Sequence, residues 1–193
     1  DIVMSLTTLR HTRRNLRRWM RDERRPVDIT FQPAKAWVRH EPLGVIGIIS
    51  PWNYPLFMAL GPLVDAIAAG NRAMIKPSEL TPRTSALLAE AIAESFDETE
   101  VTVINGDAGM AQAFSGLPFD HLVFTGSTAV GRKVMQAAAV NLTPVTLELG
   151  GKSPVVVCDD YPLEAAARSI AFGKYLNAGQ SCIGRDYARV PRG

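Results

Sequence analysis

Short apolar segments alternate with longer segments of helical periodicity along most of this chain. The longer segments carry apolar residues three and four positions apart, as amphipathic helices do, and span residues 55–70, 81–96 and 127–140. The short segments are rich in β-branched and aliphatic residues and predict strands at residues 44–50, 72–76, 101–105, 121–126 and 144–151. Strands that alternate with helices are typical of a parallel sheet covered on both faces. The sequence therefore predicts an α/β fold with a doubly wound parallel sheet.

The first 27 residues predict one amphipathic helix. Its apolar positions form a stripe that we expect to dock onto the rest of the protein: Leu9, Leu16, Trp19 and Met20. The helix should end before Pro26, because proline disfavours helical geometry in the residue before it. Eight arginines lie between Arg10 and Arg25, although the net charge is only +2. A basic stripe without a recognition motif is weak support for nucleic-acid binding, so we expect a solvated arginine face and no nucleic-acid partner.

The two cysteines have different surroundings. Cys158 lies in the apolar run SPVVVCD, which predicts a buried strand where a thiol packs as a small hydrophobic group. Cys182 follows a predicted helix at 163–176 and the glycine-bearing stretch NAGQS, at an element end where reactive groups are often displayed. The pair forms neither a disulfide framework nor a metal-binding pattern. We therefore expect no metal and a reducing, cytoplasmic compartment.

Composition bounds the class of protein. A chain of 193 residues with 47% hydrophobic content can bury a substantial core. No secretory signal opens the sequence, and its most apolar stretch, residues 45–70, is interrupted by Pro51, Pro55, Pro62 and Asp65. We therefore expect no membrane span in this segment.

Polar side chains follow the first two predicted strands. Ligands of doubly wound sheets bind beyond the carboxyl ends of the strands, so these positions are candidates for a site. Trp52 and Asn53 lie between two prolines that stiffen the backbone, and Asn53 is either an ordinary turn residue or a projecting amide. Lys76 and Glu79 offer a cation and a carboxylate suited to ribose hydroxyls or phosphate, but alone they could be surface charge.

A glycine-framed turn, GSTAVGRK, follows the strand at 121–126. It opens a helix whose free amides and positive dipole end could receive a diphosphate. The spacing of Gly126 and Gly131 matches part of a Walker loop, but Arg132 and Lys133 stand where that loop needs lysine and then serine or threonine. The chain also lacks GxGxxG, so on its own this turn is a weak signal for nucleotide binding.

Glu148 alternates with Leu147 and Leu149 on a strand that we expect to be buried. Burial of a carboxylate is costly unless the group is paired or neutral. Two interpretations stay open at this point: Glu148 is satisfied by a structural partner, or it is retained as a general base with a raised pKa.

Five stretches occur together in the order and approximate spacing of one family: PWNYP, KPSE, FTGSTAVG, LELGGKSP and NAGQSC. The chain therefore resembles the aldehyde dehydrogenase superfamily from about Arg39 almost to its end. The sequence of the stretch NLTPVTLELGGKSPVVV is most similar to the class 3 branch, which includes fatty and coniferyl aldehyde dehydrogenases. The resemblance implies a Rossmann-like fold of the aldehyde dehydrogenase type and a small-molecule aldehyde as substrate.

The resemblance also implies a division of the chain. It gives an N-terminal helix at residues 1–27, a bridging segment for subunit association at 28–42, an NAD(P)-binding domain at 43–149 and the beginning of a catalytic α/β domain at 150–193. An intact member of this branch is expected to form a homodimer.

Three residues match the family's catalytic groups. Cys182 matches the nucleophile, which attacks the aldehyde carbonyl as a thiolate. Asn53 matches the oxyanion donor that acts together with the backbone N–H of Cys182. Glu148 matches the general base that activates water to hydrolyse the thioester, which argues for an acid as product rather than transfer to coenzyme A.

The cofactor residues transfer in the same way. Lys76 and Glu79 resemble contacts to the adenosine ribose, and Gly126 and Ser127 resemble contacts to the diphosphate. Further residues expected to line the cofactor cleft are Ile49, Ser50, Trp52, Gly106, Thr125 and Leu149. NAD is the expected cofactor, because a carboxylate at Glu79 accepts from a ribose 2′-hydroxyl and repels a 2′-phosphate, although NADP is compatible with this branch.

Two departures from the family pattern affect these expectations. Gly184 and Arg185 stand where the branch usually has Ala-Pro after the nucleophile, and Arg185 has no role in the pattern. The chain also ends eleven residues after Cys182, whereas the resemblance implies most of a catalytic domain beyond it. We therefore expect a fragment of a longer enzyme to which the activity belongs. The alternative is a catalytically silent dinucleotide-binding fragment.

Overall fold

Five parallel strands form the central sheet of the computed structural model, which describes residues 1–191. The spatial order is β5-β4-β3-β6-β7, and each neighbouring pair is parallel. The bounds of the strands are β3 Val45–Ile49, β4 Arg72–Lys76, β5 Val101–Val103, β6 His121–Gly126 and β7 Val145–Leu149. The predicted doubly wound α/β fold is confirmed, and each of its five strands lies where the apolar segments placed it.

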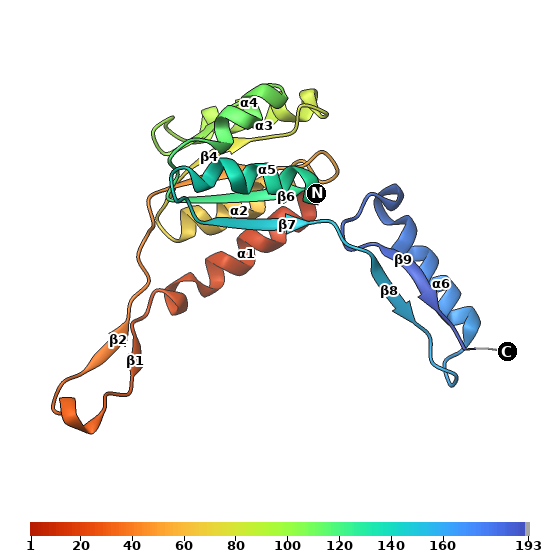
Figure 1. Cartoon of the computed structure of the whole chain (residues 1–193), viewed down its shortest axis with the longest axis horizontal. Helices are drawn as coiled ribbons and strands as arrows, with labels where there is room; N and C mark the ends of the chain where they lie inside the picture. The colour runs from red at the N-terminus through yellow and green to blue at the C-terminus, as the bar shows by residue number, and fades with distance from the viewer. Residues whose placement is uncertain (192–193) are drawn as a thin grey trace.

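Helices cover both faces of this sheet (Figure 1). Helices α2 (Phe57–Ala68) and α3 (Pro82–Ser95) cover one face, where Ile48 and Ile75 of the strands are completely buried. Helices α4 (Ala108–Ser115) and α5 (Thr128–Ala139) cover the other face around Phe124 of β6. Because side chains of a strand alternate between faces, one five-stranded sheet supports both cores.

The N-terminal helix α1 (Ile2–Trp19) packs along α2, and as predicted it ends before Pro26. The predicted docking stripe is wrong, because Leu9, Trp19 and Met20 are exposed. The buried positions of the helix are Ser5 and Thr12, and the Thr12 hydroxyl lies 3.5 Å from Oδ1 of Asp65 on α2. Small side chains let two helix backbones approach closely, which explains why serine and threonine occupy the contact in place of leucine.

A two-stranded antiparallel ribbon projects from the end of α1 (Figure 1). It consists of β1 (Glu23–Arg25) and β2 (Ala36–Val38), joined through the 3₁₀ turn η1 (Ile29–Phe31). Arg39 donates two hydrogen bonds to the Asp22 carboxylate, at 2.8 and 2.7 Å, and this pair closes the base of the ribbon. The ribbon therefore includes residues of both the expected helical segment and the expected bridging segment.

The last described part of the chain is a small unit of its own that lies beside the sheet (Figure 1). Strand β8 (Ser153–Val156) pairs in parallel with β9 (Arg185–Arg189), and α6 (Leu163–Tyr175) and the 3₁₀ turn η2 (Leu176–Gly179) connect them. We call residues 153–191 the C-terminal unit. Cys158 was predicted in a buried strand, but β8 ends at Val156 and Cys158 is exposed. The apolar run VVV extends beyond the strand, because Val155 and Val156 pair with residues of β9 and the strand ends there.

Within residues 1–191, no helix is long and apolar enough to cross a membrane. The same residues hold no group of three or more histidine, cysteine, aspartate or glutamate side chains arranged to bind a metal ion.

Candidate active site

The carboxyl ends of four strands lie together at one edge of the sheet. Ile49 at the end of β3 is opposite Lys76 of β4 and Phe124 of β6, and Gly126 of β6 is opposite Leu149 of β7. The strand order reverses between β3 and β6, because the chain proceeds from β3 outward to β5 and then returns to the other side. Such a switch point is where doubly wound sheets bind ligands.

The loop after β3 contacts the loop that carries Cys182. Nδ2 of Asn53 donates a hydrogen bond of 2.6 Å to the carbonyl oxygen of Gln180, and Nδ2 of Asn177 donates one of 2.9 Å to the carbonyl oxygen of Asn53. These two hydrogen bonds join the loop after β3 to the C-terminal unit, and both involve Asn53. The structure thus brings two of the three predicted catalytic residues into neighbouring loops.

Cys182 is half-buried in the turn between η2 and β9. The approach to this turn has three successive residues with positive φ: Asn177 at 53°, Ala178 at 55° and Gly179 at 79°. L-residues other than glycine rarely adopt such angles, so the loop is a specifically held conformation. The backbone N–H of Cys182 has no hydrogen-bond partner in the described part of the chain, so it is available to an incoming oxyanion.

Glu148 lies in a different environment from the one that the sequence indicated. Strand β7 is at the edge of the sheet, and its side chains alternate between half-buried and exposed. Leu147 and Leu149 pack on the core with α5, whereas Glu148 and Thr146 are on the exposed face. The expectation that Glu148 is buried is therefore wrong for the described residues. When helices cover only one face of an edge strand, the side chains on its other face stay exposed.

Lys76 is the largest completely buried side chain in the described structure, although it carries a charge. Its ammonium group donates a hydrogen bond of 2.8 Å to the carbonyl oxygen of Pro77 and lies 3.4 Å from Oε2 of Glu79. Next to it, at the end of β3, the hydroxyl of Ser50 is buried and has no hydrogen-bond partner within residues 1–191. Buried polar groups normally have partners. The Ser50 hydroxyl, beside the Lys76 ammonium group, therefore fits a polar ligand at the sheet edge.

The N-terminus of α5 follows directly on β6. Ser127 caps the helix, and its hydroxyl accepts a hydrogen bond of 3.3 Å from the backbone N–H of Val130. A Cβ atom at Gly126 would lie 2.5 Å from Cζ of Phe124, so only glycine fits this turn. Thr125 is buried beside it. The helix end presents free backbone N–H groups and partial positive charge at the same edge as Lys76.

Of the other predicted cofactor residues, Ile49 and Leu149 use their side chains for the fold. Ile49 is buried in the core beneath α4 and α5, and Leu149 packs against the same core. Gly106 precedes α4 and faces Met110, whereas Trp52 is exposed on the loop after β3. At Ile49 and Leu149, the backbone is therefore the part of the residue that could face a ligand.

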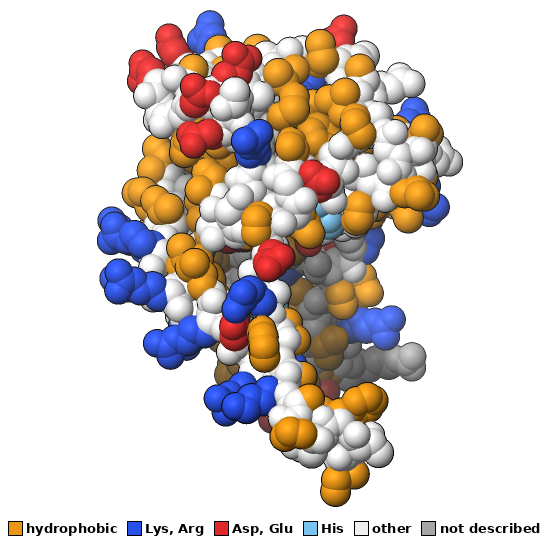
Figure 2. All heavy atoms as spheres, turned by 90° about the vertical axis from the view of Figure 1, so that its left-hand side faces the viewer, with side chains coloured by type: hydrophobic (Ala, Val, Ile, Leu, Met, Phe, Trp, Pro, Cys, Tyr) orange, Lys and Arg blue, Asp and Glu red, His pale blue; other side chains and the backbone are white. Residues whose placement is uncertain are grey.

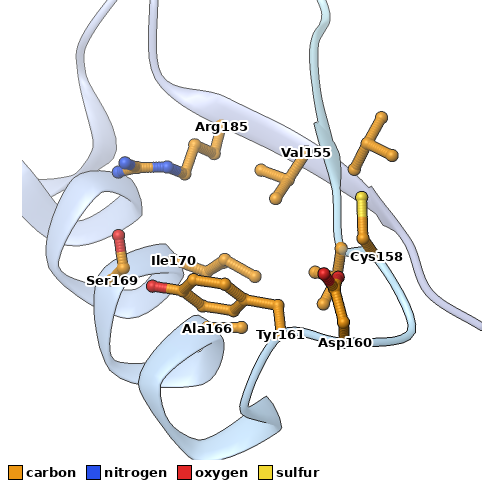
Figure 3. A pocket seen from close by; sticks show the side chains of 10 residues that line it. Val155, Cys158, Asp160, Tyr161, Ala166, Ser169, Ile170 and Arg185 are labelled. Atoms are coloured by element: carbon orange, nitrogen blue, oxygen red, sulfur yellow. The ribbon is translucent and has the colours of Figure 1, made fainter.

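The structure gives Arg185 a packing role. Its guanidinium group lies directly over Gly173 on α6, where even a Cβ atom would overlap it. The side chain also lines an open cavity of about 310 Å³ between the two strands and α6, together with Ser169, Tyr161 and Cys158 (Figure 3). Cys158 therefore faces a cavity of the C-terminal unit that is lined by none of the predicted catalytic residues.

Parallel strands that meet at a switch point, an amide-bearing loop and a half-buried thiol in the neighbouring loop define this site. The model of the aldehyde dehydrogenase family matches residues 1–192, and the chain belongs to this family.

Particular relatives extend this assignment. The chain is 56% identical over 191 residues to the "Probable coniferyl aldehyde dehydrogenase" of Pseudomonas aeruginosa, covering 99% of this chain and 40% of that relative. The structure of Staphylococcus aureus AldH in a substrate-bound state matches with a TM-score of 0.95 and 43% identity, over 98% of this chain and 42% of that chain. An aldehyde dehydrogenase of Mycobacterium tuberculosis complexed with NAD+ matches with a TM-score of 0.87 and 37% identity, over 98% of this chain and 39% of that chain.

The chain spans about 40% of the length of the curated relatives it matches. The match to Staphylococcus aureus AldH covers both the sheet and the C-terminal unit. The loop of Asn53 and the loop of Cys182 therefore both lie within the part of the chain that shares this fold.

Proposed function

We propose that this chain carries the dinucleotide site and the nucleophile of an enzyme that oxidises a hydrophobic or aromatic aldehyde to its carboxylic acid with NAD(P). The observation that carries the proposal is the hydrogen bond from Asn53 to Gln180. It joins the loop at the end of β3 to the loop of Cys182, so an oxyanion donor and a thiol can serve the same carbonyl group. The names of curated relatives support an aldehyde as substrate.

The first step is addition of the Cys182 thiolate to the aldehyde carbon. The carbonyl oxygen becomes an alkoxide and needs hydrogen-bond donors as its charge develops. The Asn53 amide has two N–H bonds, of which one is used on Gln180, and the second can donate to the alkoxide together with the free N–H of Cys182. One such donor typically lowers the barrier by about 3 kcal/mol.

The second step converts the thiohemiacetal to a thioester and then to the acid. The nicotinamide ring of bound NAD(P) supplies the acceptor for the hydride that leaves the former aldehyde carbon. Glu148 accepts a proton from a water molecule as that water attacks the thioester, and the Cys182 sulfur leaves as thiolate. The exposed position of Glu148 supports this role, because the hydrolytic water must have access to the base.

The residues at the sheet edge fit a dinucleotide. The buried Lys76 ammonium group and the unpartnered Ser50 hydroxyl can bind polar groups of the adenosine ribose, and Glu79 can accept from a ribose hydroxyl. The N-terminus of α5 at Ser127 can bind the diphosphate through its free N–H groups. A carboxylate beside the ribose favours NAD over NADP, because it repels a 2′-phosphate.

The projecting ribbon fits the proposed subunit contact. Its exposed apolar side chains include Ile29, Phe31 and Trp37. Figure 2 looks toward this ribbon and shows apolar side chains at the tip at the bottom, with basic side chains gathered to one side above it. Such side chains become buried when a second copy associates, and we propose a homodimer for the intact enzyme.

The direct test is aldehyde-dependent NADH formation by the protein and by two matched cysteine variants. Cys182→Ser should lower the rate at least 1,000-fold, because a hydroxyl is a far weaker nucleophile at neutral pH. Cys158→Ser should leave the rate within twofold, because Cys158 lies in a cavity apart from the proposed site. Coniferaldehyde and a long-chain aliphatic aldehyde, assayed separately, test the substrate class. If the unsubstituted protein forms NADH, equal rates for the two variants would disprove the assigned nucleophile.

A dinucleotide-binding fragment without turnover is the second candidate, favoured by the 40% coverage of the relatives' length. Fluorescence titration with NADH separates the two functions. Binding without NADH formation supports the second candidate, and comparable turnover in this chain and a longer form of the protein excludes it.

A further inference from the structure

Two lysines converge on one carboxylate directly beyond the Cys182 turn. Oδ1 of Asp186 lies 3.1 Å from Nζ of Lys174, and Oδ2 lies 2.8 Å from Nζ of Lys152. Each carboxylate oxygen thus has its own ammonium partner. Hydrogen bonds from Lys152 and then from Lys174 hold the pKa of Asp186 below its usual value, and the same carboxylate raises the pKa of Lys152.

These three residues come from three different segments of the site. Lys174 is in the last turn of α6, before η2, and Asp186 is in β9, directly after the Cys182 turn. Their ion pair therefore closes a loop of which Cys182 is a member. Lys152 is in the link that leads from Glu148 on β7 to β8, so the second ion pair fastens this link to the same point.

The closed loop has unfavourable backbone angles. Asn177 and Ala178 both have positive φ, and a flexible loop would relax from such angles if its ends separated. The contacts with Asn53 hold one side of the loop, and Asp186 joins its two ends. Asp186 is also the least exposed member of the three, with 22% of its side-chain surface accessible against 41% for Lys174 and 84% for Lys152.

The geometry points to Asp186 as a positioning residue for the nucleophile. Its ion pair with Lys174 joins the two ends of the Cys182 loop, and its ion pair with Lys152 connects this loop to the segment that follows β7. This inference rests on the proposed function, because it assigns a role relative to the same thiol. Asp186 does not react with the substrate. It limits the positions that the Cys182 turn can take, and its loss should make that thiol more accessible.

The test measures alkylation of the two cysteines by iodoacetamide between pH 6 and 9, with the rate at each site read by peptide mass spectrometry. Asp186→Asn should raise the rate at Cys182 at least threefold at every pH while Cys158 stays within twofold. Cys158 is an internal reference, because this exposed thiol of the same unit is already accessible to the reagent, and circular dichroism reports any unfolding of the variants. Glu164→Gln is the matched variant, since it removes a carboxylate and an ion pair with Arg168 from the same unit. It should leave both rates unchanged.

Single-lysine variants extend the test if Asp186→Asn fails to fold. Lys174→Met and Lys152→Met should each raise the Cys182 rate selectively, and neither should add to the effect of Asp186→Asn. Asp186→Glu should restore part of the original rate. An unchanged Cys182 rate, an equal rise at both cysteines, or a shift in the pH midpoint without a change in the limiting rate would overturn the inference. Alkylation requires neither aldehyde nor NAD(P), so this result is independent of whether the chain forms NADH.

Discussion

At the scale of single residues, Lys76 illustrates how a charge is kept inside this fold. Burial of an ammonium group is costly, and here the carbonyl of Pro77 and the carboxylate of Glu79 offset that cost. The side chain is thereby fixed at the edge where β3 and β4 end. A cation held in one place binds a ligand without the entropy loss that an exposed lysine would have.

We predict that Lys76→Met raises the dissociation constant for NADH by about tenfold or more, because hydrogen bonds from charged groups contribute about 1.5–3 kcal/mol. Methionine retains most of the length of the side chain. Arg72→Met is the control, since Arg72 is an exposed cation at the opposite end of the same strand. NADH fluorescence titration measures both constants. If the two variants bind equally well, Lys76 does not contact the dinucleotide.

The sequence predicted the surroundings of some candidate site residues better than those of others. Asn53 and Cys182 were identified by motifs, and the structure places their loops in contact. The exposure of Glu148 was not predictable from its alternation with leucines, because the pattern shows that Leu147 and Leu149 share a face but not what covers the opposite face. Asp186 gave no local signal, since Lys174 is 12 residues away and Lys152 is separated from it by β8, α6 and η2.

At the scale of elements, the contact between α1 and α2 depends on small side chains. The sequence predicted that the large apolar residues of α1 would dock onto the rest of the protein. Hydrophobic periodicity identifies the most apolar face of a helix, but the face that packs closest to α2 carries Ser5 and Thr12. Helix α4 was also missed, since it is short and its sequence contains few large apolar residues. The five strands of the sheet were predictable because each is a short segment rich in β-branched and aliphatic residues.

We predict that Thr12→Leu lowers the free energy of unfolding by about 1–3 kcal/mol, because a larger side chain must push α1 away from Asp65 on α2. Thr7→Leu makes the same change at an exposed position of the same helix and should alter stability by about 0.5 kcal/mol or less. Urea unfolding followed by circular dichroism gives both values. A neutral Thr12→Leu would contradict the close packing of the helices.

At the scale of the whole molecule, paired carboxylates are spread over the ribbon, the sheet domain and the C-terminal unit. Hydrogen bonds from Arg39 lower the pKa of Asp22, those from Thr99 lower the pKa of Asp97, and those from the two lysines lower the pKa of Asp186. A depressed pKa in the folded state contributes stability that is present above the unfolded pKa, about 3.9 for aspartate, and is lost as pH falls through the folded value.

We therefore predict that the urea midpoint is flat between about pH 5 and pH 9 and falls below about pH 4. The raised pKa values of Lys152 and Arg39 have the opposite sign, so their contributions are lost only at strongly alkaline pH. Asp186→Asn should flatten part of the acid-side decline. A decline centred near pH 6.5 would instead indicate that a histidine controls stability.

The link between the sheet and the C-terminal unit has a consequence for recombination among relatives. A Cβ atom added at Gly150 or Gly151 would have no neighbour within 4 Å, so this link makes no packing demand on its surroundings. Exchange of the C-terminal unit for that of another family member therefore depends on the contacts between the two units and not on packing around the link. A chimaera joined here must preserve, across the junction, the hydrogen bonds between Asn53 and the loop of Asn177 and Gln180.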